Sequence, residues 1–313
     1  MTDQLVLGVD LGGSSTRVLV TDAGGVPVGT GRAGGGNPVA RGLDTMRVNL
    51  TAALESALAG VDPSRVAMAV LGLAGVSTYG EAFQRAIGDV WSTVGLTCPR
   101  ELRPDTEVAF AAGGAGDHGF VLVSGTGAVA AYVQDSHLTR SVDGHGWLLG
   151  DRGSGFWVGR EGMMAALAAI EGNGPETTLR DTIPAALGVA REDGALALTR
   201  AVYQRPPVTL AELAPIVTAA AGSGDAVALH IMARTAGALL DSLQTVHRAA
   251  GAPSDLPVVL GGGLLRADIP ASRDLCQQVW RGIVGIGLRP YLAQAAETGA
   301  VTLAISALSK QGV

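Results

Sequence analysis

The sequence predicts an α/β protein of two lobes, and three observations indicate this fold class. The chain has 313 residues, more than one ordinary hydrophobic core accommodates, and 47% of them are hydrophobic. An apolar strand, a glycine-rich turn and a second apolar strand occur at residues 8–20 and again at 120–133. The 46 glycines lie in short clusters without a repeat, which indicates tight turns rather than a linker or a fibre. We therefore expect a duplicated architecture.

The N-terminal third of the chain predicts three strands followed by alternating helices and strands. The second and third strands are joined by Asp22–Gly25, a hairpin-type turn. Leucine and methionine recur at helical spacing from Leu43 to Leu58, which predicts a helix over 42–59. The expected strands are 5–10, 16–21, 26–31, 66–76 and a short one reaching Asp105, and further helices are expected near 80–90 and from Glu107.

The remainder of the chain begins with the repeat of the opening pattern, followed by a further strand near 138–142. Residues 156–251 are expected to be almost wholly helical, ending in a long helix from about Asp225. A final strand over 257–260 leads into a glycine cluster, and helices close the chain. The glycine-rich residues 113–118 mark the domain boundary, which gives lobes of 1–114 and 115–313. We expect the last helix to pack back on the N-terminal lobe.

The composition excludes several classes of function. The net charge is −6 and no basic run is present, which argues against a nucleic-acid surface. Long uncharged stretches such as 119–134 are broken by Ser-Gly-Thr-Gly and fall short of a membrane-spanning helix. The first eight residues hold an Asp and no basic residue, unlike a signal peptide. Cys98 and Cys276 have no partner spacing and fit a reduced cytoplasm. We therefore expect a cytoplasmic protein with no nucleic-acid or membrane partner.

The glycine turns are candidates for phosphate binding, because backbone N–H groups without a nearby Cβ can surround phosphate oxygens. A dinucleotide-binding turn needs a helix after it, and here a strand follows. A P-loop or a protein-kinase site needs a lysine near the turn, but Lys310 is the only lysine in the chain. The remaining option is a pair of strand–turn–strand hairpins, one from each lobe, that hold one phosphate chain. A glycine turn can also be purely structural.

Asp10 ends the first strand directly before the glycine turn. A carboxylate beside phosphates is reasonable if it holds Mg²⁺ directly or through water. The sequence thus predicts a magnesium site at Asp10. The order of "VDLGGSST", "SGTGA" and a third cluster, "VVLGGGLLR", favours the nucleotide interpretation over the structural one.

These motifs resemble those of the sugar kinase, Hsp70 and actin superfamily, and within it the N-acetylglucosamine kinase and BadF/BadG/BcrA/BcrD-type ATPase family. The resemblance covers nearly the whole chain through "GVDLGGSSTR", "LGLAGV", "RPD", "SGTGA", "GDRGSGFW" and "LGGGL". It implies a two-lobed actin-like (ribonuclease H-like) ATPase fold, with duplicated βββαβαβα domains around an ATP cleft, and a homodimer. The ATP-binding residues that it implies are Gly12, Gly13, Ser14, Ser15, Thr16, Ser124, Gly125, Thr126, Gly127, Gly261, Gly262 and Gly263.

Asp105 is the candidate catalytic residue. Phosphoryl transfer to a sugar hydroxyl needs a group that accepts the hydroxyl proton, and in the similar kinases the Asp of the "RPD" motif does so. The alternative is that Asp105 only caps the helix that follows it, a position that Asp favours. Both roles can hold together, because a cap would fix the direction of the carboxylate.

The resemblance also implies a sugar pocket. Its residues would be Asn37, Gly75, Asp105, Thr126, His145, Gly146, Trp147 and Asp151. Asn37 precedes a proline and is alternatively a turn residue. We expect Trp147 near the pocket and Trp157 in the core.

Two residues depart from the family pattern in this region, His145 and Arg152. Arg152 either pairs with a surface carboxylate or binds an anionic substituent such as a lactyl group. These departures put the exact sugar in doubt, but not the reaction.

The function that follows from the resemblance is an ATP- and Mg²⁺-dependent kinase for the 6-hydroxyl of N-acetylglucosamine or a close relative. Glucosamine and N-acetylmuramate are alternative substrates. An activator ATPase of the same family is a second class, but it would need cysteines that bridge a cluster between subunits. A sugar-responsive repressor would need a helix-turn-helix before the first strand.

A ribokinase-like site with Asp225 or Asp117 as its base is a further alternative, since each follows a glycine-rich turn. We expect Asp225 instead to cap the long helix and to line the adenine pocket. The histidines at 118, 137, 230 and 247 are scattered, and no metal site is predicted from them.

Overall fold

The computed structural model describes residues 4–75, 80–266, 268 and 272–311. The chain divides into two compact units. Unit 1 is made of Met1–Gly119, Val133–Leu138 and Ala293–Val313, and unit 2 is made of Phe120–Tyr132 and Thr139–Leu292. Each unit contains most of one five-stranded sheet.

The sheet of unit 1 has the strand order β3-β2-β1-β4-β5. Strand β1 is antiparallel to β2 and parallel to β4, and β4 is parallel to β5. The parallel strands β1, β4 and β5 therefore end at the same edge of the sheet. The strands are β1 (Leu5–Leu11), β2 (Ser15–Asp22), β3 (Pro27–Gly34), β4 (Val66–Leu73) and β5 (Arg100–Pro104).

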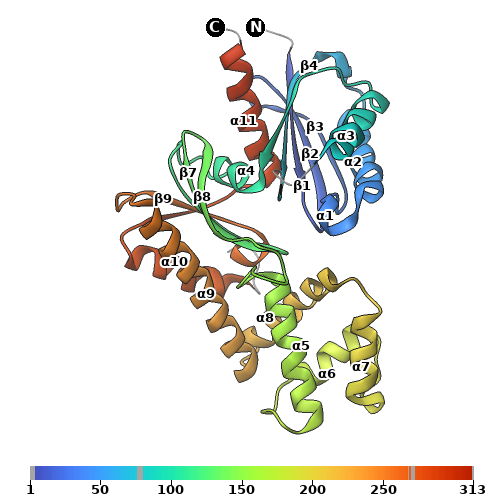
Figure 1. Ribbon diagram of the computed structural model, residues 1–313, viewed down its shortest axis with the longest axis vertical. Coiled ribbons are helices and arrows are strands. Elements are labelled where there is room, and N and C mark those ends of the chain that lie inside the picture. The colour runs from blue at the N-terminus through green and yellow to red at the C-terminus, as the bar shows by residue number, and fades with distance from the viewer. Residues whose placement is uncertain (1–3, 76–79, 267, 269–271, 312–313) are drawn as a thin grey trace. The chain divides into compact units, whose positions relative to one another are not determined.

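Helices cover both faces of this sheet (Figure 1). One face packs against α2 (Leu43–Ala57) and α3 (Glu81–Thr93), and the other against α4 (Asp105–Ala111) and α11 (Ala296–Gln311). The contact of α11 with β1 is close, since a β-carbon at Gly8 would stand 2.6 Å from the carbonyl oxygen of Glu297. The first turn of α11 thus lies directly over the middle of β1. A short helix, α1 (Pro38–Arg41), and a 3₁₀ turn, η1 (Pro63–Arg65), complete the first part of this unit.

The second sheet has the strand order β10-β9-β6-β7-β8. Strand β9 is parallel to both β6 and β10, so β6 and β9 end at the same edge. The strands are β6 (Gly119–Ser124), β7 (Ala128–Gln134), β8 (His137–Asp143), β9 (Pro257–Gly261) and β10 (Arg289–Leu292).

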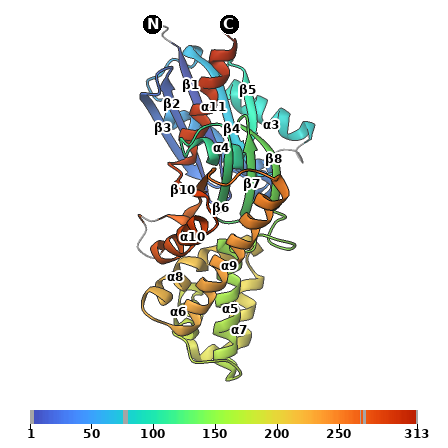
Figure 2. The same ribbon diagram turned by 90° about the vertical axis from the view of Figure 1, so that its left-hand side faces the viewer.

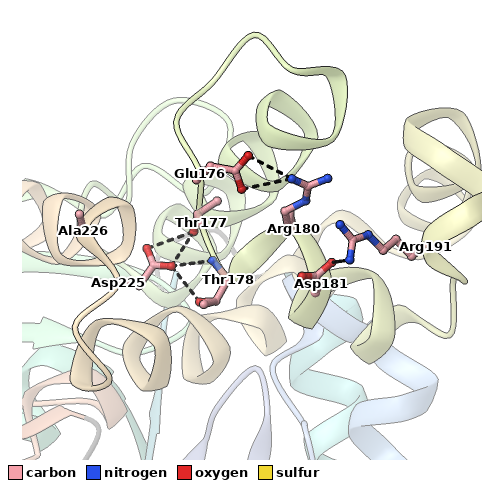
Figure 3. A pocket seen from close by; sticks show the side chains of 8 residues that line it. All are labelled: Glu176, Thr177, Thr178, Arg180, Asp181, Arg191, Asp225 and Ala226. Atoms are coloured by element: carbon pink, nitrogen blue, oxygen red, sulfur yellow. Dashed lines mark hydrogen bonds and ion pairs between the residues drawn. The ribbon is translucent and has the colours of Figure 1, made fainter.

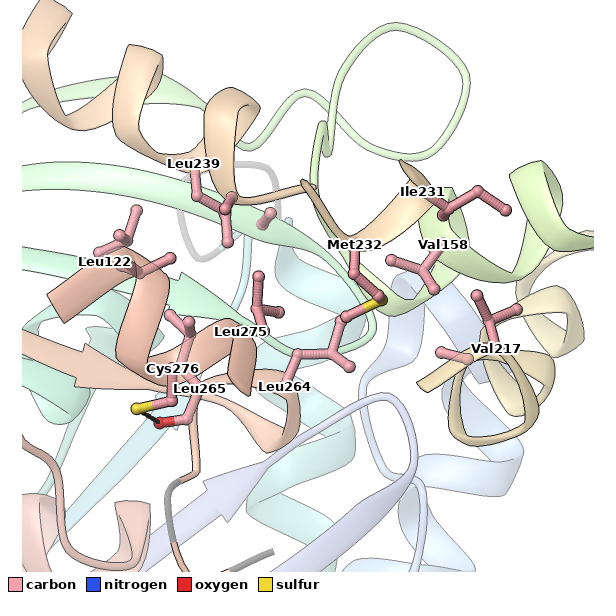
Figure 4. Packing of buried hydrophobic residues seen from close by; sticks show 14 of the residues in the cluster. Leu122, Val158, Val217, Ile231, Met232, Leu239, Leu264, Leu265, Leu275 and Cys276 are labelled. Carbon is pink, nitrogen blue, oxygen red and sulfur yellow. Dashed lines mark hydrogen bonds between the residues drawn. The ribbon is translucent and has the colours of Figure 1, made fainter. Parts of the chain in front are cut away.

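The helices of unit 2 (Figure 2) form a large apolar core with this sheet, and part of this core is drawn in Figure 4. Leu122 of β6 lies in the same buried cluster as Leu239 and Leu275, which come from two different helices. The helices are α5 (Gly155–Glu171), α6 (Leu179–Leu187), α7 (Gly194–Tyr203), α8 (Ala214–Gly222), α9 (Ala226–Ala250) and α10 (Arg273–Gly285), and the 3₁₀ segments are η3 (Arg191–Asp193), η4 (Pro207–Leu213) and η5 (Gly263–Leu265).

Helix α9 is the one helix, among the residues that the structure describes, with the length and apolar composition to cross a membrane. Half of its most apolar window is buried inside the protein. Ile231, Leu239, Leu243 and Val246 belong to the core of unit 2, and a core helix passes the same test of length and composition.

Most predicted elements are present, and three of the predictions differ from the structure. The helix expected from Glu107 begins at Asp105, so Asp105 is its first residue and Pro104 occupies the N-cap position. The prediction that 257–260 is the final strand is wrong, because β10 follows it near the end of the chain. The strand expected over 66–76 ends at Leu73, and Val76 lies outside the described residues.

Candidate functional site

The candidate residues of unit 1 gather where the three parallel strands end. Asp10 is the second-last residue of β1 and is paired in register with Gly72 of β4. Gly75 follows β4 by two residues, and Asp105 directly follows β5. Ligand sites of α/β proteins commonly lie at the carboxyl ends of parallel strands. The topology thus brings the predicted metal ligand and the predicted base to one edge of one sheet.

The glycine turn between β1 and β2 is tied to the segment that carries Asn37. The carbonyl oxygen of Gly12 accepts hydrogen bonds from the backbone N–H groups of Gly36 at 3.0 Å and Asn37 at 3.1 Å. The Asn37 side chain is buried, donates to the Ala74 carbonyl oxygen at 3.4 Å and accepts from the Val39 N–H at 3.0 Å. Asn37 therefore joins the turn to the loop of Gly75, while it also shapes the Asn-Pro turn.

The predicted ATP-binding residues of this turn differ in exposure. Gly12, Gly13 and Ser15 are partly exposed and Ser14 is fully exposed. Thr16 is completely buried, and its hydroxyl donates to the carbonyl oxygen of Gly34 at 2.9 Å. The turn itself therefore offers backbone to a ligand, while the Thr16 side chain holds β2 to β3.

Asp10 has an unusual electrostatic environment. Burial raises its pKa to about 7, the positive charge of Arg17 opposes this, and the negative charges of Asp105 and Glu297 add to it. Glu297 lies in the first turn of α11, and its Oε2 is buried without a hydrogen-bond partner. These carboxylate oxygens are the ligands that Mg²⁺ prefers. The donor set therefore fits a divalent cation at Asp10.

Glu297 was not among the residues singled out from the sequence. It is separated from Asp10 by most of the chain, and "AAETGA" carries no motif. The chain brings it to Asp10 because α11 packs across β1. The one local signal for Glu297 is that it is an acidic residue at the start of an apolar helix. Acidic residues at this position are usually explained by their favourable interaction with the helix dipole.

Asp105 opens helix α4 and is partly buried. Its Oδ1 accepts from the N–H of Thr106 at 3.0 Å. Asp105 is the first helical residue and Pro104 occupies the N-cap position, so Asp105 does not stand at the usual capping position of α4.

The candidate residues of unit 2 also gather at one sheet edge, around the turn Ser124–Gly127. The first residues of α5 hold this turn. The N–H groups of Gly155 and Phe156 donate to the carbonyl oxygens of Gly125 at 2.7 Å and Thr126 at 3.3 Å, respectively. The Ser124 hydroxyl is buried and donates to the carbonyl oxygen of Gly153 at 2.7 Å. The turn is thus fixed on the N-terminus of α5.

The third glycine cluster contacts this turn directly. Gly262 has φ of +89°, and a β-carbon there would stand 2.3 Å from the carbonyl carbon and oxygen of Ser124. Only glycine permits both this backbone conformation and this approach. The predicted phosphate residues 124–127 and the predicted adenosine residues 261–263 are therefore in direct backbone contact.

Asp151 lies against the same turn. Its Oδ1 accepts from the N–H of Ala128 at 3.3 Å, and a β-carbon at Gly127 would stand 3.0 Å from its Oδ2. Burial raises the pKa of Asp151, and the negative charge of Asp143 adds to this, while the N–H groups of Ala128 and Gly146 and the His145 side chain oppose it. The predicted sugar carboxylate and the predicted phosphate turn are therefore neighbours.

His145, Gly146 and Trp147 lie in the loop between β8 and α5. Trp147 is 46% exposed and its ring centroid lies 5.5 Å from that of Phe156. Trp157 packs against the core of unit 2, as expected, with the guanidinium of Arg234 over its ring. The Arg152 guanidinium lies 3.7 Å from Asp241, so it pairs with a surface carboxylate.

Asp225 is the N-cap of α9, as predicted, and both of its carboxylate oxygens accept hydrogen bonds. It accepts from the N–H groups of Val227 and Ala228 at 3.0 Å and from the Thr177 and Thr178 side chains (Figure 3). Burial opposes ionisation, but the hydrogen bonds from Ala228, Thr178 and Thr177 outweigh it and lower the pKa to about 2. Such an acid is a poor general base at neutral pH, which disfavours the ribokinase-like interpretation.

Asp225 also lines a cavity of about 400 Å³ in unit 2. Charged side chains dominate its lining, and Arg180 and Arg191 are paired with Glu176 and Asp181 (Figure 3). The lining residues are Glu176, Thr177, Thr178, Arg180, Asp181, Arg191, Asp225 and Ala226. This lining offers little apolar surface to a purine base.

Asp117, the other alternative base, lies beside His118 on the surface of unit 1. His118 contacts the carboxylates of Asp117 at 2.7 Å and Asp135 at 3.5 Å. The bond from His118 lowers the pKa of Asp117, and the same bond raises the pKa of His118. The three side chains could hold a metal ion by their spacing, but all stand at least partly in solvent and form ion pairs with one another.

The chain is similar to several known proteins over most of its length. The chain is 24% identical over 277 residues to N-acetyl-D-glucosamine kinase of Dictyostelium discoideum, which covers 84% of this chain and 86% of that protein. A provisionally assigned N-acetylglucosamine kinase from Chromobacterium violaceum superposes with a TM-score of 0.74 at 22% identity, over 96% of this chain and 99% of the other. A ROK family glucokinase from Streptomyces griseus, solved with glucose and AMPPNP, gives 0.61 at 19% identity, over 98% and 100%.

The structural similarities define a two-lobed α/β fold with two five-stranded sheets, which confirms the fold class predicted from the sequence. The family model for the BadF/BadG/BcrA/BcrD ATPase family matches residues 7–304. The chain belongs to this family.

Proposed function

We propose that the protein is an ATP- and Mg²⁺-dependent amino-sugar kinase that phosphorylates the 6-hydroxyl of N-acetylglucosamine or a close relative. The observation that carries the proposal is the contact of Asp151 with the turn Ser124–Gly127. A carboxylate suits sugar hydroxyls because it accepts two hydrogen bonds, and the glycine turn suits phosphates. Their adjacency is what transfer of a phosphoryl group to a sugar requires.

The relatives support a sugar phosphotransferase. The Dictyostelium relative is an N-acetyl-D-glucosamine kinase, and the Streptomyces structure is a glucokinase that holds glucose and an ATP analogue. The family is one of ATPases, which supports ATP as the phosphoryl donor. The alternative of an activator ATPase needs cysteines available to bridge a cluster, but Cys98 and Cys276 are both buried, and Cys276 donates to the carbonyl oxygen of Leu265.

In the proposed reaction, Asp105 accepts the proton of the sugar 6-hydroxyl as that oxygen attacks the γ-phosphorus of ATP. Asp10, with Glu297 beside it, would hold Mg²⁺, which neutralises charge on the phosphates when bound. Gly12–Ser15 and Ser124–Gly127 bind the phosphates through their backbone, and Gly261–Gly263 bind the adenosine. Asp151, Asn37, Gly75 and the loop of His145–Trp147 orient the sugar.

The environment of Arg152 bears on the choice of sugar. Its guanidinium is paired with Asp241, and its backbone N–H donates to Asp143 at 2.9 Å. An anionic lactyl group would have to compete with Asp241 for this arginine. We therefore place N-acetylglucosamine and glucosamine ahead of N-acetylmuramate, and propose a homodimer that works in the cytoplasm.

A coupled ADP-release assay tests the proposal with glucosamine, N-acetylglucosamine, N-acetylmuramic acid and glucose as acceptors. We expect Mg²⁺-dependent turnover that is fastest with one of the two non-anionic amino sugars. Phosphorus NMR of the product should show a 6-phosphate ester. Turnover at the level of ATP hydrolysis without sugar, for all four acceptors, would contradict the proposal.

A further inference from the structure

The loop that carries His145, Gly146 and Trp147 is closed at its base by one side chain, that of Asp143. Asp143 is the last residue of β8, and Asp151 directly follows the loop segment 144–150. Oδ1 of Asp143 accepts from the N–H of Gly144 at 2.9 Å and from the N–H of Asp151 at 2.6 Å. Its Oδ2 accepts from the N–H of Arg152 at 2.9 Å. One carboxylate thus joins the two ends of the loop.

The backbone at both ends of the loop is in a conformation that needs such support. Asp143 has φ of +67° and Asp151 has φ of +56°, the left-handed region that residues other than glycine rarely occupy. Gly150 makes room for the carboxylate, because a β-carbon there would stand 2.3 Å from Oδ1 of Asp143. The strained backbone persists because the hydrogen bonds to Asp143 hold it.

The conformation of Asp151 decides where its own carboxylate lies. With its N–H held by Asp143, the Asp151 side chain reaches the N–H of Ala128 and the position that a β-carbon at Gly127 would occupy. The two carboxylates repel each other, and this repulsion contributes to the raised pKa of Asp151. A like charge placed beside a ligand-binding acid costs stability, so its presence suggests a functional reason.

The loop that Asp143 closes presents apolar side chains to solvent. Trp147, Leu148 and Leu149 are 46%, 74% and 81% exposed. Asp143 therefore fixes both the Asp151 carboxylate and a loop with exposed apolar side chains, the two kinds of group that line small-molecule sites.

We propose that Asp143 is a positioning residue for the sugar, which acts by holding the backbone of Asp151 and the loop 144–150. This inference rests on the proposed sugar kinase activity. It predicts that loss of the Asp143 carboxylate weakens sugar binding and leaves ATP binding intact, because N–H groups of α5 also hold the ATP residues 124–127.

The variant Asp143→Gly removes the carboxylate without adding strain, since glycine accepts a positive φ. We expect the KM for the sugar to rise about tenfold, with the KM for ATP changed less than about twofold. Asp143→Asn keeps one oxygen acceptor and tolerates the left-handed backbone, so its KM for the sugar should rise only about threefold.

Asp135→Gly is the matched control. Asp135 also has a positive φ, of +53°, but lies in the turn before β8, outside the site. It should keep both KM values within about twofold of wild type. Thermal melting of all variants checks that they are folded.

A second comparison places Asp143→Gly in an Asp151→Asn background. If Asp143 acts through Asp151, the rise in KM that Asp143→Gly causes falls to less than about twofold in that background. A sugar KM for Asp143→Gly equal to that of wild type, or a full tenfold rise in both backgrounds, would overturn the inference.

Hydrogen exchange of the backbone amides in the ligand-free protein separates this inference from the proposed function. Asp143→Gly should speed exchange at Asp151 and Arg152 by at least about tenfold, and Asp135→Gly should not. If wild type phosphorylates no sugar, the proposed function fails, but fast exchange at these two amides still supports the role of Asp143 in holding Asp151. Unchanged exchange there would refute it.

Discussion

Oδ2 of Asp151 lies 3.0 Å from the point where a β-carbon at Gly127 would stand. The two residues are 24 positions apart in the sequence, and they come together because the loop after β8 folds back on the turn between β6 and β7. This contact joins the residue proposed to hold the sugar to the turn proposed to hold the phosphates.

Gly127→Ala should therefore impair sugar binding. The added methyl group meets the carboxylate of Asp151 closer than ordinary van der Waals contact, so Asp151 or the turn must move. A displacement of a few tenths of an ångström to 1 Å at a reacting centre can cost roughly 10- to 100-fold in kcat/KM. Steady-state kinetics with the preferred sugar measure this loss.

The matched control for that variant is Gly237→Ala. Gly237 lies on the exposed side of α9, and nothing stands within 4 Å of its would-be β-carbon. Alanine favours the helix by up to about 1 kcal/mol, so this variant should be fully active and slightly more stable. Equal kinetics for the two variants would show that the Gly127–Asp151 contact is unimportant.

Asp10→Asn should stabilise the metal-free protein while it abolishes activity. An acid whose pKa is raised from 3.8 to about 7 costs the folded state free energy as pH rises above 3.8, and the full cost is present above about 7. At pH 7.5 with a chelator, we expect a gain of roughly 2–4 kcal/mol in the free energy of unfolding. Denaturant titration measures it.

The same variant tests the metal site. In the presence of ATP, addition of Mg²⁺ should raise the melting temperature of wild type further and leave that of Asp10→Asn unchanged, because a ligand stabilises only the state that binds it. The exposed Glu55→Gln serves as a control that removes one carboxylate elsewhere in unit 1. An Asp10→Asn protein that is less stable than wild type in chelator would contradict the account of its burial.

Asp225→Asn should remove a pH dependence of the free energy of unfolding without removing the cap of α9. The pKa of Asp225 is lowered from 3.8 to about 2, so its ionised form contributes stability above pH 3.8 that is lost as pH falls toward 2. Asn still accepts from the N–H groups of Val227 and Ala228, and it is a good N-cap residue. The difference in stability between wild type and variant should therefore shrink between about pH 4 and pH 2. A constant difference would be evidence against the lowered pKa.

The parts of the fold that could be predicted from the sequence are those with strong local signals. Strands β1 and β2 flank a glycine turn with clear apolar runs, and α2 shows leucines at helical spacing. Asp225 was identified as an N-cap because it follows a glycine and precedes an apolar helix. Strand β10 has no such signal, since its four residues, Arg289–Leu292, include a proline and none is buried.

The site shows the same division between local and distant information. Asp10, Asp105 and Asp151 could be singled out because each lies in a motif. Glu297 and Asp143 could not, because their importance depends on contacts with residues that only tertiary packing brings near. Nothing local to the Asp-Gly pair at 143–144 reveals that the Asp143 carboxylate accepts hydrogen bonds from the backbone of Asp151 and Arg152.

The central claim is tested most directly by the turnover number of Asp105→Asn with the preferred amino sugar. This kcat is compared with that of wild type and that of the surface variant Asp89→Asn. The account predicts that Asp105→Asn loses a factor of roughly 10²–10⁴ in kcat, since the proton acceptor is removed, while its affinity for ATP stays within about threefold. Asp89→Asn should match wild type, because Asp89 only pairs with Arg47 on the surface. An Asp105→Asn enzyme with the wild-type kcat would contradict the assignment of Asp105 as the base.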